Sequence, residues 1–257
     1  MPDILSEVLA FDGLASLCAG VFLAGAVRGF SGFGAALVYM PIAGQFMPPV
    51  WALITLVVME VFGPIPNLPS AWRTADLGQV GRIALGGAVA LPIGLAVLLA
   101  VEPEVFRYAV SAIALMVPFL LMSGMRLKGA ITQPMQYGTG LISGFIGGVA
   151  GLPGPPVILL YMASTTAAAV TRANIMLYLV AVDLLLIGIL SLIGILSLKG
   201  EMALMPLVLG LLLAIPNLLG NLAGAAMFHP DRQMLYRVFG YVVMITVGLS
   251  GLPLWDG

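Results

Sequence analysis

Five long stretches of this chain contain no charged residue, and they constrain its fold more than any other feature. They are residues 29–59, 83–101, 108–125, 129–171 and 202–228. About 20 consecutive apolar residues are enough to span a bilayer as a helix. Soluble domains carry about 25% charged residues, whereas this chain of 257 residues carries 8%, with 61% apolar residues. The sequence therefore predicts an all-α polytopic membrane protein. The short alternating segments typical of a transmembrane β-barrel are not seen.

Two glycine-rich stretches interrupt these apolar runs, one in each half of the chain. The first is Gly-Phe-Ser-Gly-Phe-Gly at residues 29–34, and the second is Gly-Gly-Val-Ala-Gly-Leu-Pro-Gly at residues 147–154. A broken helix frees backbone N–H and C=O groups that lipid cannot satisfy, so they need protein, water or a ligand. Paired breaks of this kind are the best sequence indication of a midplane substrate site in a secondary transporter.

The breaks belong to a wider internal repeat. Ala90-Leu91-Pro92 in the first half resembles Ala214-Ile215-Pro216 in the second. We interpret residues 1–128 and 129–257 as two homologous membrane repeats that form one integrated transmembrane domain. The helical segments expected are 10–28, 33–47, 50–72, 80–101 and 105–125, then 134–150, 153–165, 171–197, 203–227 and 233–253.

Segments 33–47 and 153–165 are too short to span a bilayer, and their direction decides the symmetry. If each continues the segment before it, each half crosses four times and the repeats are parallel. If each turns back as a re-entrant or broken helix, each half has five elements and the repeats are inverted. The second arrangement places most basic residues on one face, as the positive-inside rule favours. It also places both termini on the outer side.

The two breaks and the repeat together resemble the sulfite exporter TauE/SafE family, also called the 4-toluene sulfonate uptake permease family. The first copy of its glycine motif is Gly32-Phe33-Gly34, and the second is Gly151-Leu152-Pro153-Gly154. The resemblance covers nearly the whole chain. It implies transport of sulfur oxyanions and organosulfonates across the bacterial inner membrane, driven by ion gradients. Phe33 and Pro153 stand where the family commonly has glycine, which leaves the identity of the anion open.

A helix that starts just after a break directs several unpaired N–H groups and its positive dipole end at one place, which favours an anion. Arg28 adjoins the first break and could bind a sulfonate with two hydrogen bonds. The alternatives are close helix packing for the glycines, a loop position for Arg28, and structural hydrogen bonds for the asparagines. The expected substrate-binding residues are Arg28, Gly29, Ser31, Gly32, Phe33, Gly34, Gly151, Leu152, Gly154, Asn174, Asn217 and Asn221.

Glu60 and Asp183 are the carboxylates deepest in apolar sequence. Burial favours the protonated form of a carboxyl group, so either residue could carry a proton coupled to anion movement. The alternative is a carboxylate that is paired with an arginine or held near a membrane surface.

We expect a secondary transporter of sulfite or an organosulfonate that works by alternating access around the two breaks. A passive anion channel, or an uptake permease for another small organic anion, is the alternative. A membrane enzyme would need clustered catalytic side chains, and the single histidine, single cysteine and dispersed carboxylates argue against one. No cofactor or metal is expected. The expected partners are the anion and membrane lipid; nucleic acid is not expected at a net charge of −1, and a homodimer is left open.

Overall fold

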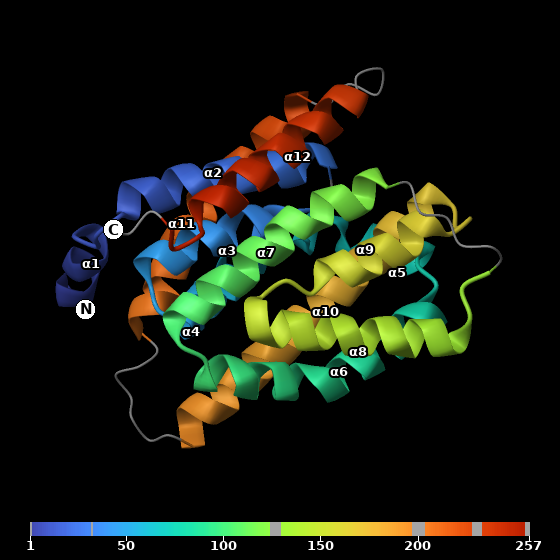
Figure 1. The fold of residues 1–257 in the computed structure, drawn as a ribbon, viewed down its shortest axis with the longest axis horizontal. Coiled ribbons are helices and arrows are strands. Elements are labelled where there is room, and N and C mark those ends of the chain that lie inside the picture. Colours follow the sequence, from blue (N-terminus) through green and yellow to red (C-terminus); the bar gives the residue numbers. More distant parts are fainter. Residues whose placement is uncertain (1, 32, 124–129, 197–203, 228–232, 255–257) are drawn as a thin grey trace. The chain divides into compact units, whose positions relative to one another are not determined.

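The computed structural model describes residues 2–31, 33–123, 130–196, 204–227 and 233–254. Every regular element in these ranges is a helix (Figure 1). The helices are α1 (Pro2–Leu9), α2 (Leu14–Ser31), α3 (Ala35–Phe46), α4 (Pro49–Glu60), the 3₁₀ helix η1 (Ile65–Asn67), α5 (Leu68–Thr74), α6 (Leu77–Ala100), α7 (Pro103–Met122), α8 (Gln133–Ala150), α9 (Gly154–Ala163), α10 (Ala168–Leu196), α11 (Leu204–Met227) and α12 (Gln233–Ser250).

Four helices of the described chain are long and apolar enough to cross a membrane. They are α6, α7, α11 and the Ala168–Leu192 part of α10. Large apolar side chains are also exposed in rows, such as Leu85, Val89 and Ile93 along one face of α6. Rows of this kind suit contact with lipid tails rather than water. The prediction of an all-α, multi-pass membrane protein is confirmed.

Nine of the ten expected segments correspond to single helices, and one does not. The prediction of one segment over residues 50–72 is wrong, because the chain leaves helix α4 after Glu60 and continues as η1 and α5. Proline residues at 64, 66 and 69 explain the interruption, since proline lacks the N–H that an unbroken helix needs. Helix α1, near the N-terminus, was not expected at all.

The short helix α3 turns back along α2. A methyl group placed on Gly13, just before α2, would collide with the ring of Phe46 at the end of α3. One placed on Gly20 would lie 2.6 Å from Ile42. The chain also reverses after α8, because Pro153 lies beside Ser143, two turns back from the end of that helix. At about 18 Å for α3 and about 15 Å for α9, neither helix spans a bilayer. Each is a separate element, as in the five-element arrangement; the inverted symmetry stays a prediction.

The helices fall into two compact units, each of which combines segments from both halves of the sequence. Unit 1 comprises residues 1–63, 102–118 and 190–257, and unit 2 comprises residues 64–101 and 119–189. In unit 1, α2 packs along α11, while α3 and α4 contact each other and helices α12 and α11 respectively. In unit 2, α6 packs along α8, and α9 contacts α8. Figure 1 shows α6 and α8 side by side.

The two main helix pairs are reciprocal. Helix α2 precedes the first break and packs on α11, the helix of the second half that contains Pro216. Helix α8 precedes the second break and packs on α6, the helix of the first half that contains Pro92. Each half therefore supplies one member of each pair, as expected of duplicated segments that interlock. The repeat boundary at residue 128 stays a prediction, because residues 124–129 lie outside the described ranges.

Candidate functional site

The first break is a connection of three residues, 32–34, between α2 and α3. Helix α2 continues to Ser31, so Gly29 lies in its last turn and not in the break. Phe33 is half-buried in the connection. Gly32 and the side chain of Ser31 lie outside the described residues. The break is thus narrower than the sequence indicated, because α2 stays helical where it packs on α11.

Helix α3 begins with four amide groups that have no acceptor within the helix. They belong to Gly34, Ala35, Ala36 and Leu37, since the first internal bond of the helix joins the Val38 N–H to the Gly34 carbonyl at 3.2 Å. No side chain caps this end, and Gly34 has a φ of 95°, which favours glycine. The start of α3 therefore offers a group of backbone donors suited to an anion.

The second break is also three residues long, at 151–153. Gly151 ends α8 with a φ of 68°, and its N–H donates to the Gly147 carbonyl at 2.9 Å. This is the usual left-handed end of a helix, which satisfies a carbonyl group there. Leu152 follows and is fully buried. Residues 147–150 are helical, so this break too is narrower than the glycine pattern.

Helix α9 starts with far fewer donors than α3. It begins at Gly154 after Pro153, and Pro155 and Pro156 complete its first turn. Proline has no backbone N–H, so Gly154 carries the only amide donor among these four residues. The two breaks match in position and length but differ in chemistry, and the donor argument for an anion applies to the first one.

A chain of hydroxyl groups stabilises the second break from within the protein. The Tyr178 hydroxyl on α10 donates to Ser143 Oγ on α8 at 2.6 Å, and Ser143 Oγ donates to the carbonyl of Pro153. All three residues are buried. A backbone carbonyl freed by the break is therefore satisfied by protein, as a membrane requires.

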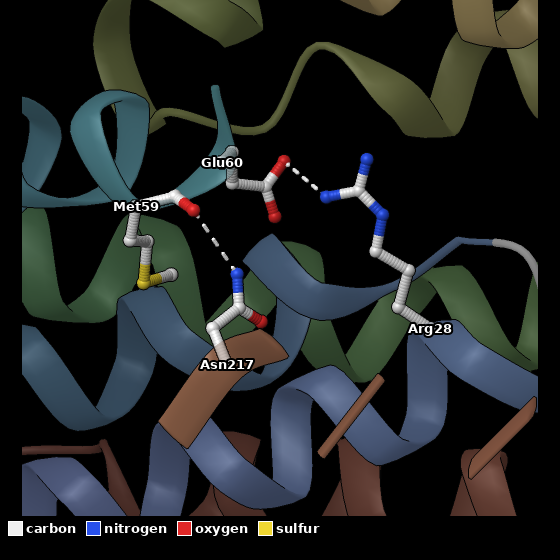
Figure 2. A network of polar contacts seen from close by, with 4 residues as sticks. All are labelled: Arg28, Met59, Glu60 and Asn217. Carbon is white, nitrogen blue, oxygen red and sulfur yellow. Dashed lines mark hydrogen bonds and ion pairs between the residues drawn. The ribbon is translucent and has the colours of Figure 1, made fainter. Parts of the chain in front are cut away.

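Arg28 and Glu60 form an ion pair in unit 1. Arg28 lies in the last turn of α2, and its Nη1 is 2.9 Å from Oε2 of Glu60 at the end of α4 (Figure 2). The two side chains are only 16% and 12% exposed. The structure thus corresponds to the alternative in which Glu60 is paired with an arginine. It also brings together two residues that the sequence placed in separate roles.

Asn217 on α11 lies next to this ion pair. Its Nδ2 donates to the Met59 carbonyl at 3.3 Å, which fixes the orientation of the amide, because a flipped amide would place two oxygens together (Figure 2). Among the described residues, Asn217 Oδ1, Glu60 Oε1 and Arg28 Nη1 are all buried without a hydrogen-bond partner, although Nη1 makes the ion-pair contact. Two acceptor oxygens without donors therefore lie on the neighbouring side chains of this cluster.

Gly29 and Asn221 meet at the contact between α2 and α11. A methyl group on Gly29 would collide with the Asn221 carbonyl oxygen and would lie 2.7 Å from the Ala225 nitrogen. The absence of a side chain at position 29 thus allows the two backbones to touch, which agrees with the packing alternative.

Asn174 uses both ends of its amide within unit 2. Its Nδ2 donates to the Tyr161 hydroxyl at 2.9 Å, and its Oδ1 accepts the Asp76 N–H at 2.8 Å. The Tyr161 hydroxyl in turn donates to Gln79 Oε1 at 3.2 Å. Asn174 is fully buried, and this network joins α9 and α10 to the start of α6.

The second expected proton carrier, Asp183, lies half-buried in the middle of α10, in unit 2. The structure groups Arg28, Glu60 and Asn217, and it places Asp183 and Asn174 in the other unit. The prediction that both breaks line one site stays a prediction.

Ser143 and the Met59 carbonyl are among the contributors that were missed from the sequence. Ser143 carries no motif, and its only signal is a hydroxyl seven residues before the end of a helix that leads into a break. The Met59 carbonyl is a backbone group, so no residue type could have indicated it.

Comparison with known families gives one match. A family model described as "Sulfite exporter TauE/SafE" matches residues 17–250, which include both breaks and the cluster of Arg28, Glu60 and Asn217. Neither the curated proteins nor the solved structures contain a match to this chain.

Proposed function

Because the chain belongs to the sulfite exporter TauE/SafE family, we propose that it is a secondary transporter for sulfite or an organosulfonate. It would work by alternating access, with transport driven by an ion gradient. The multi-pass helical fold and the family match support a membrane transporter rather than an enzyme. The substrate, the alternating-access mechanism and the coupling to an ion gradient are the parts that we propose.

The observation that carries the proposal is that an arginine and a group of backbone donors flank the first break. Arg28 lies one turn before the end of α2, and α3 begins four residues after that end with four amides that have no acceptor within the helix. A sulfonate or sulfite group has three acceptor oxygens, which match a guanidinium and converging N–H groups. We propose that the anion binds here, with Gly34 allowing close approach of the backbone.

The mechanism requires a charge to balance the anion during its passage. We propose that a proton on Glu60 or Asp183 supplies it, because a carboxyl group can be neutral in apolar surroundings. Alternating access would expose the loaded site to one side of the membrane and then to the other. Discontinuous helices near the midplane suit this motion.

Transport in proteoliposomes tests the proposal. Vesicles containing the purified protein are given labelled sulfite or methanesulfonate, with and without a pH gradient. We expect uptake that rises with the gradient, and counterflow when unlabelled anion is present inside. Fast flux that is insensitive to anion on the opposite side would favour a passive channel. No flux of any tested sulfur anion in a folded sample would refute the proposal.

Two arginine variants provide matched controls for the anion site. Arg28→Gln combined with Glu60→Gln removes both charges together, which avoids an unpaired buried charge, and should abolish flux. Arg73→Gln changes an exposed arginine at the end of α5 and should leave flux within about twofold of wild type.

A further inference from the structure

The cluster of Arg28, Glu60 and Asn217 has a net charge of zero, but its hydrogen bonds are incomplete. The ion pair uses Oε2 of Glu60, while Oε1 is buried without a donor. Asn217 is 5% exposed, and its Oδ1 also lacks a donor. A buried polar atom without a partner is costly, and Nη1 of Arg28, although 2.9 Å from Glu60 Oε2, also lacks a hydrogen bond of good geometry in this state.

A proton on Glu60 would supply a donor for Asn217 Oδ1. A protonated carboxyl group has one O–H donor, and Asn217 Oδ1 is the free acceptor of the cluster. Asn217 Nδ2 donates one of its two hydrogens to the Met59 carbonyl, whereas its Oδ1 has no donor. Protonation would also end the charge attraction that holds Arg28 to Glu60, so the guanidinium would be free for another anion.

We propose that Arg28, Glu60 and Asn217 form a switch that binds one anion and one proton together by exchange of partners. The substrate anion replaces Glu60 at the guanidinium of Arg28. The proton replaces Arg28 at Glu60, whose O–H donates to Asn217 Oδ1. This inference rests on the proposed function, and it identifies which carboxylate is coupled and how.

The charge balance explains why the two ligands bind together. The empty cluster holds one negative and one positive charge. The loaded cluster holds a neutral carboxyl group, the guanidinium and a monovalent anion, so its net charge is again zero. An anion alone would leave one negative charge and a proton alone one positive charge, and an uncompensated charge is expensive inside a membrane. One proton is taken from the solvent for each monovalent anion bound.

No other charged group of the described chain faces Glu60 from the packed helices. Helices α3 and α11 pack against α4, and neither contains an Asp, Glu, Lys, Arg or His. Tyr39 of α3 is bound to the Thr55 hydroxyl at 2.5 Å. On α2, Arg28 is the only charged residue. The pH dependence of anion binding at this cluster is therefore assigned to Glu60.

The test measures binding of methanesulfonate to the purified full-length protein from mildly acidic to mildly alkaline pH. This anion keeps its charge over that range, so any pH dependence belongs to the protein. We expect the affinity of the wild type to fall by up to about tenfold per pH unit as Glu60 loses its proton. Glu60→Gln, whose amide can donate to Asn217, should bind with the acidic-limit affinity at every pH. Glu104→Gln, which alters an exposed carboxylate in the first turn of α7, should behave like the wild type.

Two further measurements do not depend on that variant. Saturating methanesulfonate added to weakly buffered wild-type protein at alkaline pH should cause uptake of about one proton per anion bound. Asn217→Leu removes the acceptor, so the fall in affinity should begin at lower pH, while the acidic-limit affinity stays within about tenfold of wild type.

The outcomes separate this inference from the proposed function. Methanesulfonate binding without pH dependence, or without proton uptake, overturns the inference and leaves anion transport standing. The same pH dependence in Glu60→Gln as in the wild type also overturns it. No binding of methanesulfonate or sulfite at any pH overturns both.

Discussion

Two buried asparagines, Asn174 and Asn217, are used differently in this fold. Asn174 has a partner for each end of its amide and joins three helices of unit 2. Asn217 has a partner only for its amide nitrogen. An unsatisfied buried oxygen costs about 1–3 kcal/mol. The bonds of Asn174 connect helices of unit 2, whereas Asn217 is the residue that we propose as part of the switch.

At the residue scale, the first prediction concerns the hydroxyl chain at the second break. Ser143→Ala leaves both the Tyr178 hydroxyl and the Pro153 carbonyl without a partner from this chain of bonds. We expect a loss of stability of about 1–3 kcal/mol, seen as a lower melting temperature in detergent. Tyr178→Phe keeps the bond from Ser143 to Pro153, so it should cost less, about 0.5–1.5 kcal/mol.

The double variant of Ser143 and Tyr178 completes this cycle. The double variant has no tyrosine hydroxyl left without a partner. Its loss of stability should therefore be smaller than the sum of the losses in the two single variants. If the two single losses of stability add up to the loss in the double variant, the two hydroxyls do not interact energetically.

The sequence identified individual residues of the cluster but not their association. Arg28, Glu60 and Asn217 were each recognisable, because a charge or an amide in an apolar run is unusual. Their association depends on how α2, α4 and α11 pack, and residue type does not encode that. Ser143 had no such signal, since a serine within a membrane helix is common and usually bonds its own backbone.

At the scale of elements, both main helix pairs are built on glycine at every fourth position. Gly25 and Gly29 of α2 lie against the backbone of α11, and Gly220 and Gly224 of α11 lie against the backbone of α2, while α8 carries Gly140, Gly144 and Gly148 against α6. In lipid there is no hydrophobic force between helices, so close backbone contact supplies the attraction. This row of contacts leaves no space for a methyl group.

Gly144→Ala tests the contact between α6 and α8. The added methyl group would collide with the backbone of Gly87, and we expect a loss of about 1–3 kcal/mol. Gly138→Ala, on the same helix, meets nothing within 4 Å and should be neutral or stabilise by about 0.5–1 kcal/mol. Thermal unfolding of both variants in detergent measures the difference, and equal melting temperatures would contradict the close packing.

Gly34 and Gly151 allow the two breaks to be compared directly. Both have positive φ, so an alanine at either site costs about 1–2 kcal/mol in backbone strain. If the anion binds the donors at the start of α3, Gly34→Ala should weaken methanesulfonate binding at least tenfold, and Gly151→Ala should leave it within about threefold. An equal loss of affinity in both would indicate that the second break also binds the anion.

Helix positions were predictable from the sequence because hydropathy and length identify membrane helices. The exception, residues 50–72, shows the limit of this signal. The apolar run continues through these residues, but the proline residues interrupt the helical hydrogen bonds. Hydropathy measures the first property and not the second. The same effect made the two glycine breaks look equivalent, although Pro155 and Pro156 remove amide donors from the second.

On the scale of the whole molecule, neither sequence half can complete a main helix pair alone. Helix α2 needs α11, and α8 needs α6. The sequence predicts a duplication, which stays a prediction, but it did not indicate the reciprocal pairing, because residue types do not show which apolar faces meet.

A divided chain tests this reciprocity. Residues 1–126 and 130–257, each expressed alone, should be degraded or aggregated, because both expose glycine-lined helix faces. Expressed together, they should purify as one complex, detected through a tag on either fragment. Gly144→Ala in the second fragment should reduce its recovery with the first, and Gly138→Ala should not. A stable, monodisperse single fragment would contradict the prediction.

The pairing of α2 with α11 also determines how late in translation this helix pair can form. Helix α11 begins about 170 residues after α2 ends. At roughly 5–20 residues per second, a ribosome needs roughly 10–35 s to deliver it. For most of that interval, the nascent chain contains Arg28 and Glu60 but not yet Asn217. Until the last quarter of the chain has been translated, the face of α2 that packs on α11 has no partner. We therefore expect the nascent chain to be most accessible to membrane proteases and insertion chaperones during that time.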